Sequence, residues 1–252
     1  MGFVHFCFAI AGFSAIWLLV SYLKKQVIET EDGSPSLLFH SQEDQQLMHS
    51  YKGAFSETEY IYGMAIEEVK DLETLHILSV GLGFAYSELS AVCHLWEHKD
   101  YQITSYESEK DLVEALLAYL NQQPSIYQDQ YEKIFSIYSE HFKIPLEKIR
   151  QRLKDLLASG RWKILGAFSF QTSPNPYNAI LFDPFCARFH QQAWQMSQLL
   201  PWLENNAARI CIFSTYAAKG ELKRGLKNLG FRYEKRPGFA YKRESTFAIK
   251  GR

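Results

Sequence analysis

The sequence contains few of the residues that build disulfide-bonded or metal-stabilised folds. Its four cysteines, at positions 7, 93, 186 and 211, form no Cys-x-x-Cys pair and no spacing typical of zinc ligands. This argues against a disulfide framework and a structural metal, and we expect a reducing compartment and no bound metal. Glycine and proline are also sparse, at 14 and 8 of 252 residues, which excludes a collagen-like repeat and a low-complexity chain.

A large excess of charge of one sign is absent as well. The formal net charge is −1, and 47% of the residues are apolar, so the chain is expected to fold as one large α/β domain or two small ones. The charges are unevenly distributed, however. Residues 219–252 hold 11 basic and three acidic residues, whereas residues 1–218 hold 16 basic and 25 acidic residues. A polyanion is therefore expected to meet the C-terminal end first.

A long apolar run opens the chain at residues 3–23. As a helix it would span about 31 Å, the thickness of the hydrocarbon layer of a bilayer. Lys24 and Lys25 follow the run and would keep the rest of the chain on the cytoplasmic side. Basic residues ahead of the run and a cleavage site, both typical of a secretory signal, are not evident. Three interpretations remain open: a membrane anchor, a leader translated from a start codon assigned too far upstream, and a packed helix.

From residue 76 onward, strand patterns alternate with helix patterns. The predicted strands are 76–80, 101–106, 163–170, 179–182, 209–214, 231–235 and 240–249. The predicted helices are 54–65, 86–96, 191–203 and 219–229, with a mostly helical stretch at 110–159. This order predicts an α/β fold with a mostly parallel sheet, helices on both faces and a C-terminal antiparallel hairpin. Such folds carry their site at the carboxyl ends of the strands.

A glycine turn follows the first of the alternating strands. Gly81 permits a tight turn, and Gly83 lets a ligand approach the backbone N–H groups of the next helix. Glu107 ends the next strand, 26 residues after Gly81, where its carboxylate can accept hydrogen bonds from both ribose hydroxyls of a nucleoside cofactor. Tyr86 occupies the place of the third glycine of the dinucleotide fingerprint, which favours S-adenosylmethionine over NAD.

A carboxylate follows another predicted strand. Asp183-Pro184-Phe185 comes directly after the apolar run 179–182, so Asp183 and the ring of Phe185 are expected near the glycine turn. We expect the reaction to take place between Asp183 and the glycine turn. The alternative is a loop aspartate that accepts backbone hydrogen bonds.

His94, Glu97 and His98 form the H-x-x-E-H pattern of some zinc peptidases. The pattern falls at the end of the helix after the glycine turn, and no third ligand is suggested. We therefore expect no metal site there.

Motifs along most of the chain resemble one family. They include Glu29-Thr30-Glu31-Asp32-Gly33-Ser34-Pro35-Ser36-Leu37, His49-Ser50, Gly53-Ala54-Phe55-Ser56-Glu57-Thr58, Gly81-Leu82-Gly83-Phe84 and Asp183-Pro184-Phe185. The most distinctive are Phe213-Ser214-Thr215-Tyr216-Ala217-Ala218, Leu222-Lys223-Arg224-Gly225-Leu226, Leu229-Gly230-Phe231 and Pro237-Gly238-Phe239-Ala240-Tyr241-Lys242-Arg243-Glu244. From residue 28 to about 245, with a poor match over 110–160, the chain resembles the methyltransferase family of bacterial MnmC.

The resemblance implies a Rossmann-like class I methyltransferase fold over residues 25–252, with a helical insertion at about 110–160 and a separate apolar segment at 1–24. It implies S-adenosylmethionine as cofactor and the aminomethyl group of a modified wobble uridine in tRNA as methyl acceptor. The implied cofactor contacts are Ser79, Gly81, Gly83, Glu107, Ala167, Asp183 and Phe185. Asp183 is the candidate catalytic residue, which we expect to orient the amine as a hydrogen-bond acceptor.

Three positions differ from the family pattern. Ser79 stands where the family usually has an acidic residue, Ala85 where it has a glycine, and Ala167 where it commonly has an aspartate that holds the adenine amino group. These differences leave a second hypothesis, a catalytically eroded protein that acts as a nucleic-acid-binding or membrane-tethered module. An NAD-dependent oxidoreductase is a third.

The basic C-terminal region supplies candidate phosphate contacts for tRNA. These candidates are Lys223, Arg224, Lys227, Arg236, Lys242 and Arg243. A solvated helix face with strand-edge lysines would give the same pattern. We expect a cytoplasmic protein, free or tethered to the inner face of the cell membrane through residues 3–23.

Overall fold

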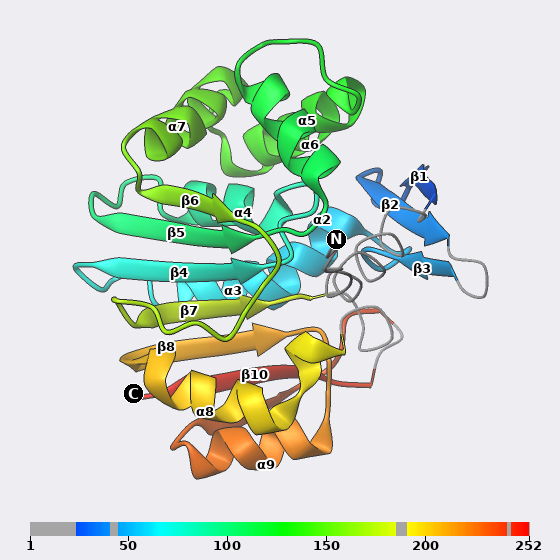
Figure 1. Cartoon of the computed structure of the whole chain (residues 1–252). Coiled ribbons are helices and arrows are strands. Elements are labelled where there is room, and N and C mark those ends of the chain that lie inside the picture. The colour runs from blue at the N-terminus through cyan, green and yellow to red at the C-terminus, as the bar shows by residue number, and fades with distance from the viewer. Residues whose placement is uncertain (1–23, 41–44, 185–190, 241–242, 252) are drawn as a thin grey trace, which may run out of the picture.

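The computed structural model describes residues 24–251 except 41–44, 185–190 and 241–242. Its main sheet has seven strands in the order β6-β5-β4-β7-β8-β10-β9 (Figure 1). In chain order these strands are β4 (Leu75–Val80), β5 (Tyr101–Tyr106), β6 (Trp162–Leu165), β7 (Tyr177–Phe182), β8 (Ala207–Thr215), β9 (Arg232–Arg236) and β10 (Ser245–Lys250).

Neighbouring strands run parallel except at β10, which pairs antiparallel with both β8 and β9. The predicted mostly parallel sheet with a C-terminal antiparallel hairpin is confirmed. The first strand of the alternation, β4, lies between β5 and β7, so the strand order reverses there. Open α/β sheets bind ligands at such a reversal, outside the carboxyl ends of the strands.

Helices cover both faces of this sheet. One face packs against α2 (Ala54–Thr58), α3 (Met64–Glu67) and α4 (Tyr86–His94), and the other against α8 (Met196–Asn206) and α9 (Gly220–Asn228). Successive strand residues alternate between the two cores: Ile77 lies in the first, and its neighbour Leu78 in the second. Burial on both faces explains why the central strands are apolar almost throughout.

The predicted helical stretch at 110–159 is three helices, α5 (Lys110–Leu120), α6 (Gln128–Phe142) and α7 (Leu146–Ala158). Proline marks both breaks, since Pro124 lies between α5 and α6 and Pro145 is the residue that caps the start of α7. In Figure 1 these helices lie beyond the β6 edge of the sheet, and both α6 and α7 contact α4.

The helix predicted at 54–65 contains a turn of a different kind. Between α2 and α3 the chain forms a π-helix, η1 (Glu59–Gly63), whose hydrogen bonds run from residue i to i+5. A π-turn leaves no trace in the apolar spacing of so short a helix. It changes which side chains share a face, and this matters at the site described below.

Three predicted boundaries are wrong. Strand β6 ends at Leu165, opposite Tyr106, rather than at 170, because its partner β5 ends there. Strand β10 begins at Ser245, opposite Arg236, rather than at 240, because β9 ends there. The helix predicted at 191–203 is a 3-10 turn, η2 (Gln192–Trp194), followed by α8. Pairing partners set the strand ends, and the apolar runs alone do not show them.

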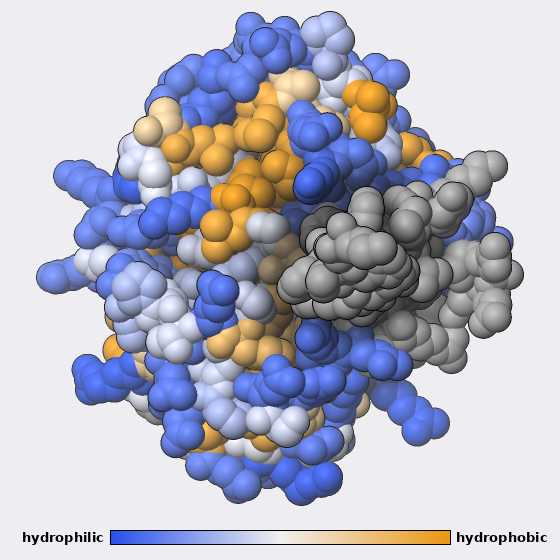
Figure 2. Space-filling view, viewed as in Figure 1, coloured by the Kyte–Doolittle hydropathy of each residue, from blue (hydrophilic) through white to orange (hydrophobic). Residues whose placement is uncertain are grey.

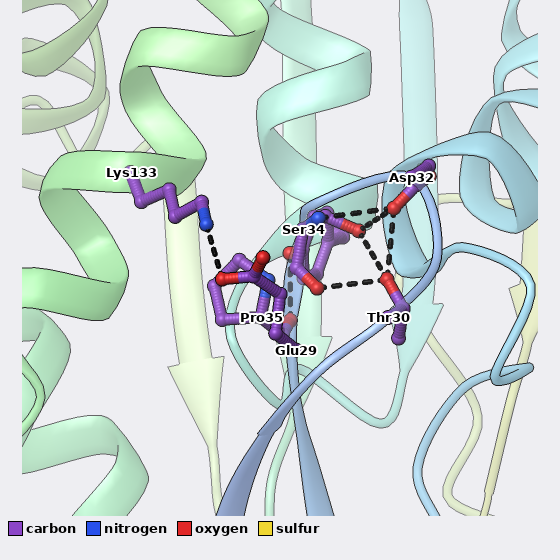
Figure 3. A network of polar contacts seen from close by, with 7 residues as sticks. Glu29, Thr30, Asp32, Ser34, Pro35 and Lys133 are labelled. Carbon is purple, nitrogen blue, oxygen red and sulfur yellow. Dashed lines mark hydrogen bonds and ion pairs between the residues drawn. The ribbon is translucent and has the colours of Figure 1, made fainter.

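A small antiparallel sheet near the N-terminus was not predicted. It consists of β1 (Lys24–Glu29), β2 (Pro35–His40) and β3 (Gln45–Leu47). Asp32 organises the turn between β1 and β2, where its carboxylate accepts hydrogen bonds from Thr30 Oγ1 at 2.8 Å and Ser34 N at 3.0 Å (Figure 3). Its other oxygen accepts from Ser56 N at 2.9 Å, so the turn is joined to the start of α2.

Among the helices of the described residues, none is both long and apolar enough to cross a membrane. The apolar segment 3–23, for which an anchor is one of the three interpretations, lies outside the described residues.

Candidate functional site

The glycine turn joins β4 to α4 at the carboxyl edge of the sheet. Gly81 and Gly83 have φ angles of +94° and +53°, which favour glycine. The N–H groups of Gly81 and Leu82 both donate to Tyr106 O at the end of β5, at 3.0 and 3.1 Å. The turn is thereby fixed to the neighbouring strand.

Asp183 lies directly against this turn. Its N–H donates to Val80 O at 2.9 Å. A β-carbon on Gly81 would lie 2.3 Å from Asp183 O, so this approach requires glycine at position 81. The structure therefore brings together the glycine turn and the strand-end aspartate, which are about a hundred residues apart in the chain.

Glu107 follows β5 and completes the same edge. Its carboxylate accepts hydrogen bonds from Gly83 N and from Glu109 N, both at 2.8 Å. Burial raises the pKa of Glu107, although both backbone donors act to lower it. The carboxylate thus lies beside the glycine turn, where a ribose would have to bind.

Ser79 lies beneath the turn and is 2% exposed. It lies beside Glu88 of α4, whose Oε1 accepts a hydrogen bond from Ser105 Oγ at 2.6 Å. Burial raises the pKa of Glu88 to about 7, while hydrogen bonds from Ser105 and Ser79 act to lower it. Glu88 belongs to none of the sequence motifs and was not predicted as a site residue. A cofactor contact through Ser79 stays a prediction.

Of the two remaining predicted cofactor residues, Ala167 and Phe185, the structure describes only Ala167. Ala167 is exposed just beyond β6, and Glu107 N donates to Leu165 O at 3.0 Å, so Ala167 lies at the same edge as Glu107. Its side chain carries no polar atom for an adenine. Phe185 lies outside the described residues.

Three polar residues that the sequence analysis did not assign to the site lie around Asp183. Tyr62 of η1 is 2% exposed. Burial first, and then the charges of Asp183 and Glu57, raise the pKa of its hydroxyl well above 10. Tyr216 follows β8 and acts on Tyr62 in the same direction. Glu57 and Tyr216 belong to motifs of the resemblance, which was a usable signal, whereas Tyr62 is placed by the π-turn.

Only some of the predicted phosphate-contacting residues lie at the carboxyl edge of the sheet. Helix α9 runs from the end of β8 back to the start of the parallel strand β9, so Lys227 in its last turn lies toward the opposite edge. Arg236 ends β9 at the site edge, where it pairs with Glu234 at 2.9 Å. Lys223 lies 3.4 Å from Glu244. Arg224 and Arg243 are exposed, and Lys242 lies outside the described residues.

The surface differs between the two ends of the sheet. Figure 2 shows apolar surface on the upper half of this face, toward β6 and the helices α5–α7, and mostly hydrophilic surface on the lower half, over α8 and α9. Leu165 at the end of β6 is 41% exposed. The hydrophilic end is the one that carries the basic C-terminal residues.

The two histidines of the zinc-peptidase pattern point to different partners. His94 lies 2.9 Å from Glu59 and 3.1 Å from Glu67, and so links α4 to η1 and α3. His98 Nε2 lies 2.6 Å from Leu72 O. Within the described residues, no group of three or more His, Cys, Asp or Glu side chains is arranged to hold a metal ion.

The sheet order, the glycine turn after β4 and the carboxylate after β5 define a class I methyltransferase fold. The sequence pattern of one family, the S-adenosyl-L-methionine-dependent methyltransferases, matches residues 121–251, and the chain belongs to this family. That stretch includes Asp183 and the basic C-terminal region and begins after the glycine turn.

Similar proteins extend the likeness to the rest of the chain. The tRNA 5-methylaminomethyl-2-thiouridine biosynthesis bifunctional protein MnmC of Hydrogenovibrio crunogenus is 27% identical over 238 residues, which is 89% of this chain and 34% of that protein. The protein of the same name from Hahella chejuensis is 38% identical over 72 residues, 29% of this chain and 11% of its own length. This chain thus spans about a third of the first relative and about a tenth of the second.

A solved structure shows the same fold. The crystal structure of MnmC2 from Aquifex aeolicus matches with a TM-score of 0.64 and 20% identity, covering 91% of this chain and 71% of that chain.

The residues present fit S-adenosylmethionine. There is no room for a β-carbon on Gly81 between the turn and Asp183. Such close packing is expected where the backbone of a glycine turn binds a cofactor next to a strand end. Glu107 faces the turn and would accept the ribose hydroxyls. The hydroxyl of Tyr62, beside Asp183, is buried and has no hydrogen-bond partner among the described residues, as expected of a group that awaits a ligand.

Proposed function

We propose that this chain transfers the methyl group of S-adenosylmethionine to the nitrogen of an aminomethyl group on a modified wobble uridine in tRNA. The observation that supports this proposal most is the backbone contact between Asp183 and the glycine turn, since a cofactor bound at that turn would lie near Asp183. The name of the Hydrogenovibrio crunogenus protein, which is similar over 89% of this chain, supports the choice of acceptor.

The site suits transfer to nitrogen. When bound, S-adenosylmethionine supplies an electrophilic methyl group. An alkylammonium with a pKa near that of lysine, about 10.4, would need about 4.6 kcal/mol to lose its proton at pH 7. Apolar surroundings reduce this cost, because they disfavour the charged form. Phe182, which directly precedes Asp183, packs against Trp194 with ring centroids 5.1 Å apart and supplies apolar surroundings at this strand end. Asp183 accepts a hydrogen bond from the amine and orients its lone pair.

A tRNA substrate agrees with the charge distribution at the site edge. Arg224 and Arg243 are exposed, and surface arginines of this kind can contact phosphates. A tRNA substrate would place the reaction in the cytoplasm, which is the localisation we propose. Membrane tethering through residues 3–23 stays a hypothesis.

The experiment is a methyl-transfer assay. Purified full-length protein is incubated with isotopically labelled S-adenosylmethionine and tRNA that carries 5-aminomethyl-2-thiouridine, and the digested nucleosides are identified by mass spectrometry. We expect label in 5-methylaminomethyl-2-thiouridine and none in tRNA whose wobble uridine is unmodified. Absence of label from both tRNAs would contradict the proposal.

The eroded-module hypothesis is retained as the second candidate because of one observation. Ser79 is engaged with Glu88 under the turn, and Ala167 offers no polar atom, so two of the polar cofactor contacts implied by the resemblance are replaced. A protein that binds tRNA but neither S-adenosylmethionine nor S-adenosylhomocysteine would establish this second function.

A further inference from the structure

The hydroxyl group of Tyr62 is buried at the candidate methyl-transfer site. Tyr62 is 2% exposed, and no described residue bonds to its Oη with good geometry, although the Asp183 carboxylate lies beside it. A buried polar group without a hydrogen bond costs about 1–3 kcal/mol. Such a group is expected to gain a partner when a ligand enters.

The π-turn explains how Tyr62 comes to this position. In η1 the hydrogen bonds run from residue i to i+5, so side chains five residues apart lie on one face. Glu57 is five residues before Tyr62 and is 5% exposed. One of its oxygens accepts a hydrogen bond from Ser50 N at 2.5 Å, which fixes its carboxylate. The charge of the Glu57 carboxylate acts on the Tyr62 hydroxyl, so the two side chains lie near each other.

Asp183 and Tyr216, which also act on the Tyr62 hydroxyl, follow two neighbouring strand ends. In the pairing of β7 with β8, Leu181 lies opposite Ser214, so Asp183 and Tyr216 leave the neighbouring strands side by side. Ser214 Oγ donates to Ile61 O at 2.7 Å, which fixes the π-turn to the end of β8 one residue before Tyr62. This bond fixes the backbone next to Tyr62, whose hydroxyl lies near the Asp183 carboxylate.

We propose that Tyr62 and Asp183 together hold the acceptor nitrogen, one N–H each, and that this restricts the site to a primary amine that receives a single methyl group. This inference rests on the proposed function and assigns Tyr62 as a positioning residue for the same reaction. Tyr62 remains a neutral phenol at physiological pH, so its oxygen can accept an N–H while its O–H donates to a neighbouring carboxylate.

The restriction follows from counting hydrogen bonds. A neutral primary amine has two N–H groups and one lone pair. With both N–H groups held, the lone pair is directed at the methyl carbon. The nitrogen forms the new N–C bond with that pair, the C–S bond breaks, and its electrons stay on the sulfur as a neutral thioether. The resulting ammonium loses one proton to water. The product keeps one N–H and cannot satisfy both acceptors, so a second transfer is disfavoured.

The test compares Tyr62→Phe with a matched control, Tyr101→Phe. Tyr101 is fully buried and its hydroxyl also lacks a partner among the described residues, but it begins β5 at the opposite edge of the sheet. Both variants and the wild type are assayed on 5-aminomethyl-2-thiouridine tRNA for kcat, and on S-adenosylmethionine for Kd. The ratio of dimethylated to monomethylated nucleoside is measured by mass spectrometry.

We expect Tyr62→Phe to lower kcat about 100-fold, as for loss of one oriented group in a transition state. Its Kd for S-adenosylmethionine should stay within threefold of wild type, and dimethylated nucleoside should appear in its product. Tyr101→Phe should match the wild type in all three measurements. A Tyr62→Phe variant that matches Tyr101→Phe in kcat, that loses cofactor binding in parallel, or that forms only monomethylated product overturns the inference.

Two further outcomes are distinguishable. If wild type methylates neither tRNA, the proposed function fails and this inference fails with it; if only the variant comparison fails, the proposed function stands. Should Tyr62→Phe not fold, Glu57→Gln replaces it, since glutamine keeps an oxygen for Ser50 N. We expect Glu57→Gln to lower kcat without weakening cofactor binding, and an unchanged kcat would overturn the inference.

Discussion

Asp183 is the residue on which the proposed chemistry depends. It follows β7, and its backbone contacts Gly81 of the glycine turn. The sequence already indicates this residue, because a carboxylate directly after a buried strand falls at the ligand edge of a parallel sheet. Tyr62 could not be predicted in the same way, since it lies in a π-turn far from Asp183 in the sequence.

We expect Asp183→Asn to abolish turnover and to leave S-adenosylmethionine binding within about threefold of wild type. Asparagine keeps the backbone contact with the turn but is a weaker acceptor for an amine N–H. Methyl transfer to tRNA and calorimetry on the same preparation check both halves. Turnover at the wild-type rate would remove Asp183 from the chemistry.

Glu88 shows how one difference from the family pattern is accommodated. Ser79 stands where the resemblance predicts an acidic residue, and the structure places the carboxyl of Glu88 beside it. A carboxyl group therefore lies under the glycine turn, supplied by α4 rather than by β4. The sequence alone could not reveal this, because nothing in the local pattern distinguishes Glu88 from a surface glutamate.

The raised pKa of Glu88 predicts a pH-dependent stability. Its pKa is about 7 in the folded protein because burial disfavours the charge, whereas the ordinary pKa of a glutamate is 4.5. The folded state then binds more protons than the unfolded state, so this group lowers the free energy of unfolding as pH rises from 4.5 through 7, by up to about 3 kcal/mol.

Glu88→Gln should remove this decrease in the free energy of unfolding with rising pH. In urea unfolding at pH 5 and pH 8, the variant should lose less stability than the wild type between the two values. Glu204→Gln, on the exposed face of α8, is the control and should follow the wild type. An equal pH dependence of Glu88→Gln and wild type would show that Glu88 does not titrate in this range.

At the scale of elements, the junction of β4 and α4 carries the strictest geometric demand. Gly81 combines a φ of +94° with a contact that leaves no space for a side chain. We expect Gly81→Ala to displace Asp183 and to weaken S-adenosylmethionine binding at least tenfold. Gly230 also has positive φ, at +83°, but nothing lies within 4 Å of its added β-carbon.

Gly230→Ala is therefore the matched control, because it has the same kind of backbone strain without the collision. It should lower the melting temperature but leave cofactor affinity unchanged. Equal affinities of the two variants would mean that the contact between the turn and Asp183 is not needed for binding.

Helices and strands with a regular apolar periodicity and clear turn residues at their ends were predictable. Strand ends that depend on pairing with a neighbouring strand were not. Strand β5 has the predicted bounds, and α9 differs by one residue at each end. Strands β6 and β10 are shorter than their apolar runs, since pairing ends with β5 and β9. The sheet β1-β2-β3 was missed because β1 is mostly polar and β3 is only three residues long.

At the scale of the whole molecule, the fold follows from the alternation of strands and helices, and the site follows from the fold. Gly81, Glu107 and Asp183 come from three separate segments and meet because β5, β4 and β7 are neighbours in the sheet. The sequence predicted this meeting. It did not predict which basic residues reach the same edge, because the direction of α9 separates Lys227 from Arg236.

Calorimetric titration of the full-length protein with S-adenosylmethionine, S-adenosylhomocysteine and NAD tests the central claim most directly. We predict binding of the first two and not of NAD. Glu107→Ala should weaken S-adenosylmethionine at least tenfold, since losing the acceptor of a buried hydrogen bond costs about 1–3 kcal/mol, whereas Glu204→Ala should not. No binding of either adenosyl compound, or equal affinities of the two variants, would contradict a cofactor site between the glycine turn, Glu107 and Asp183.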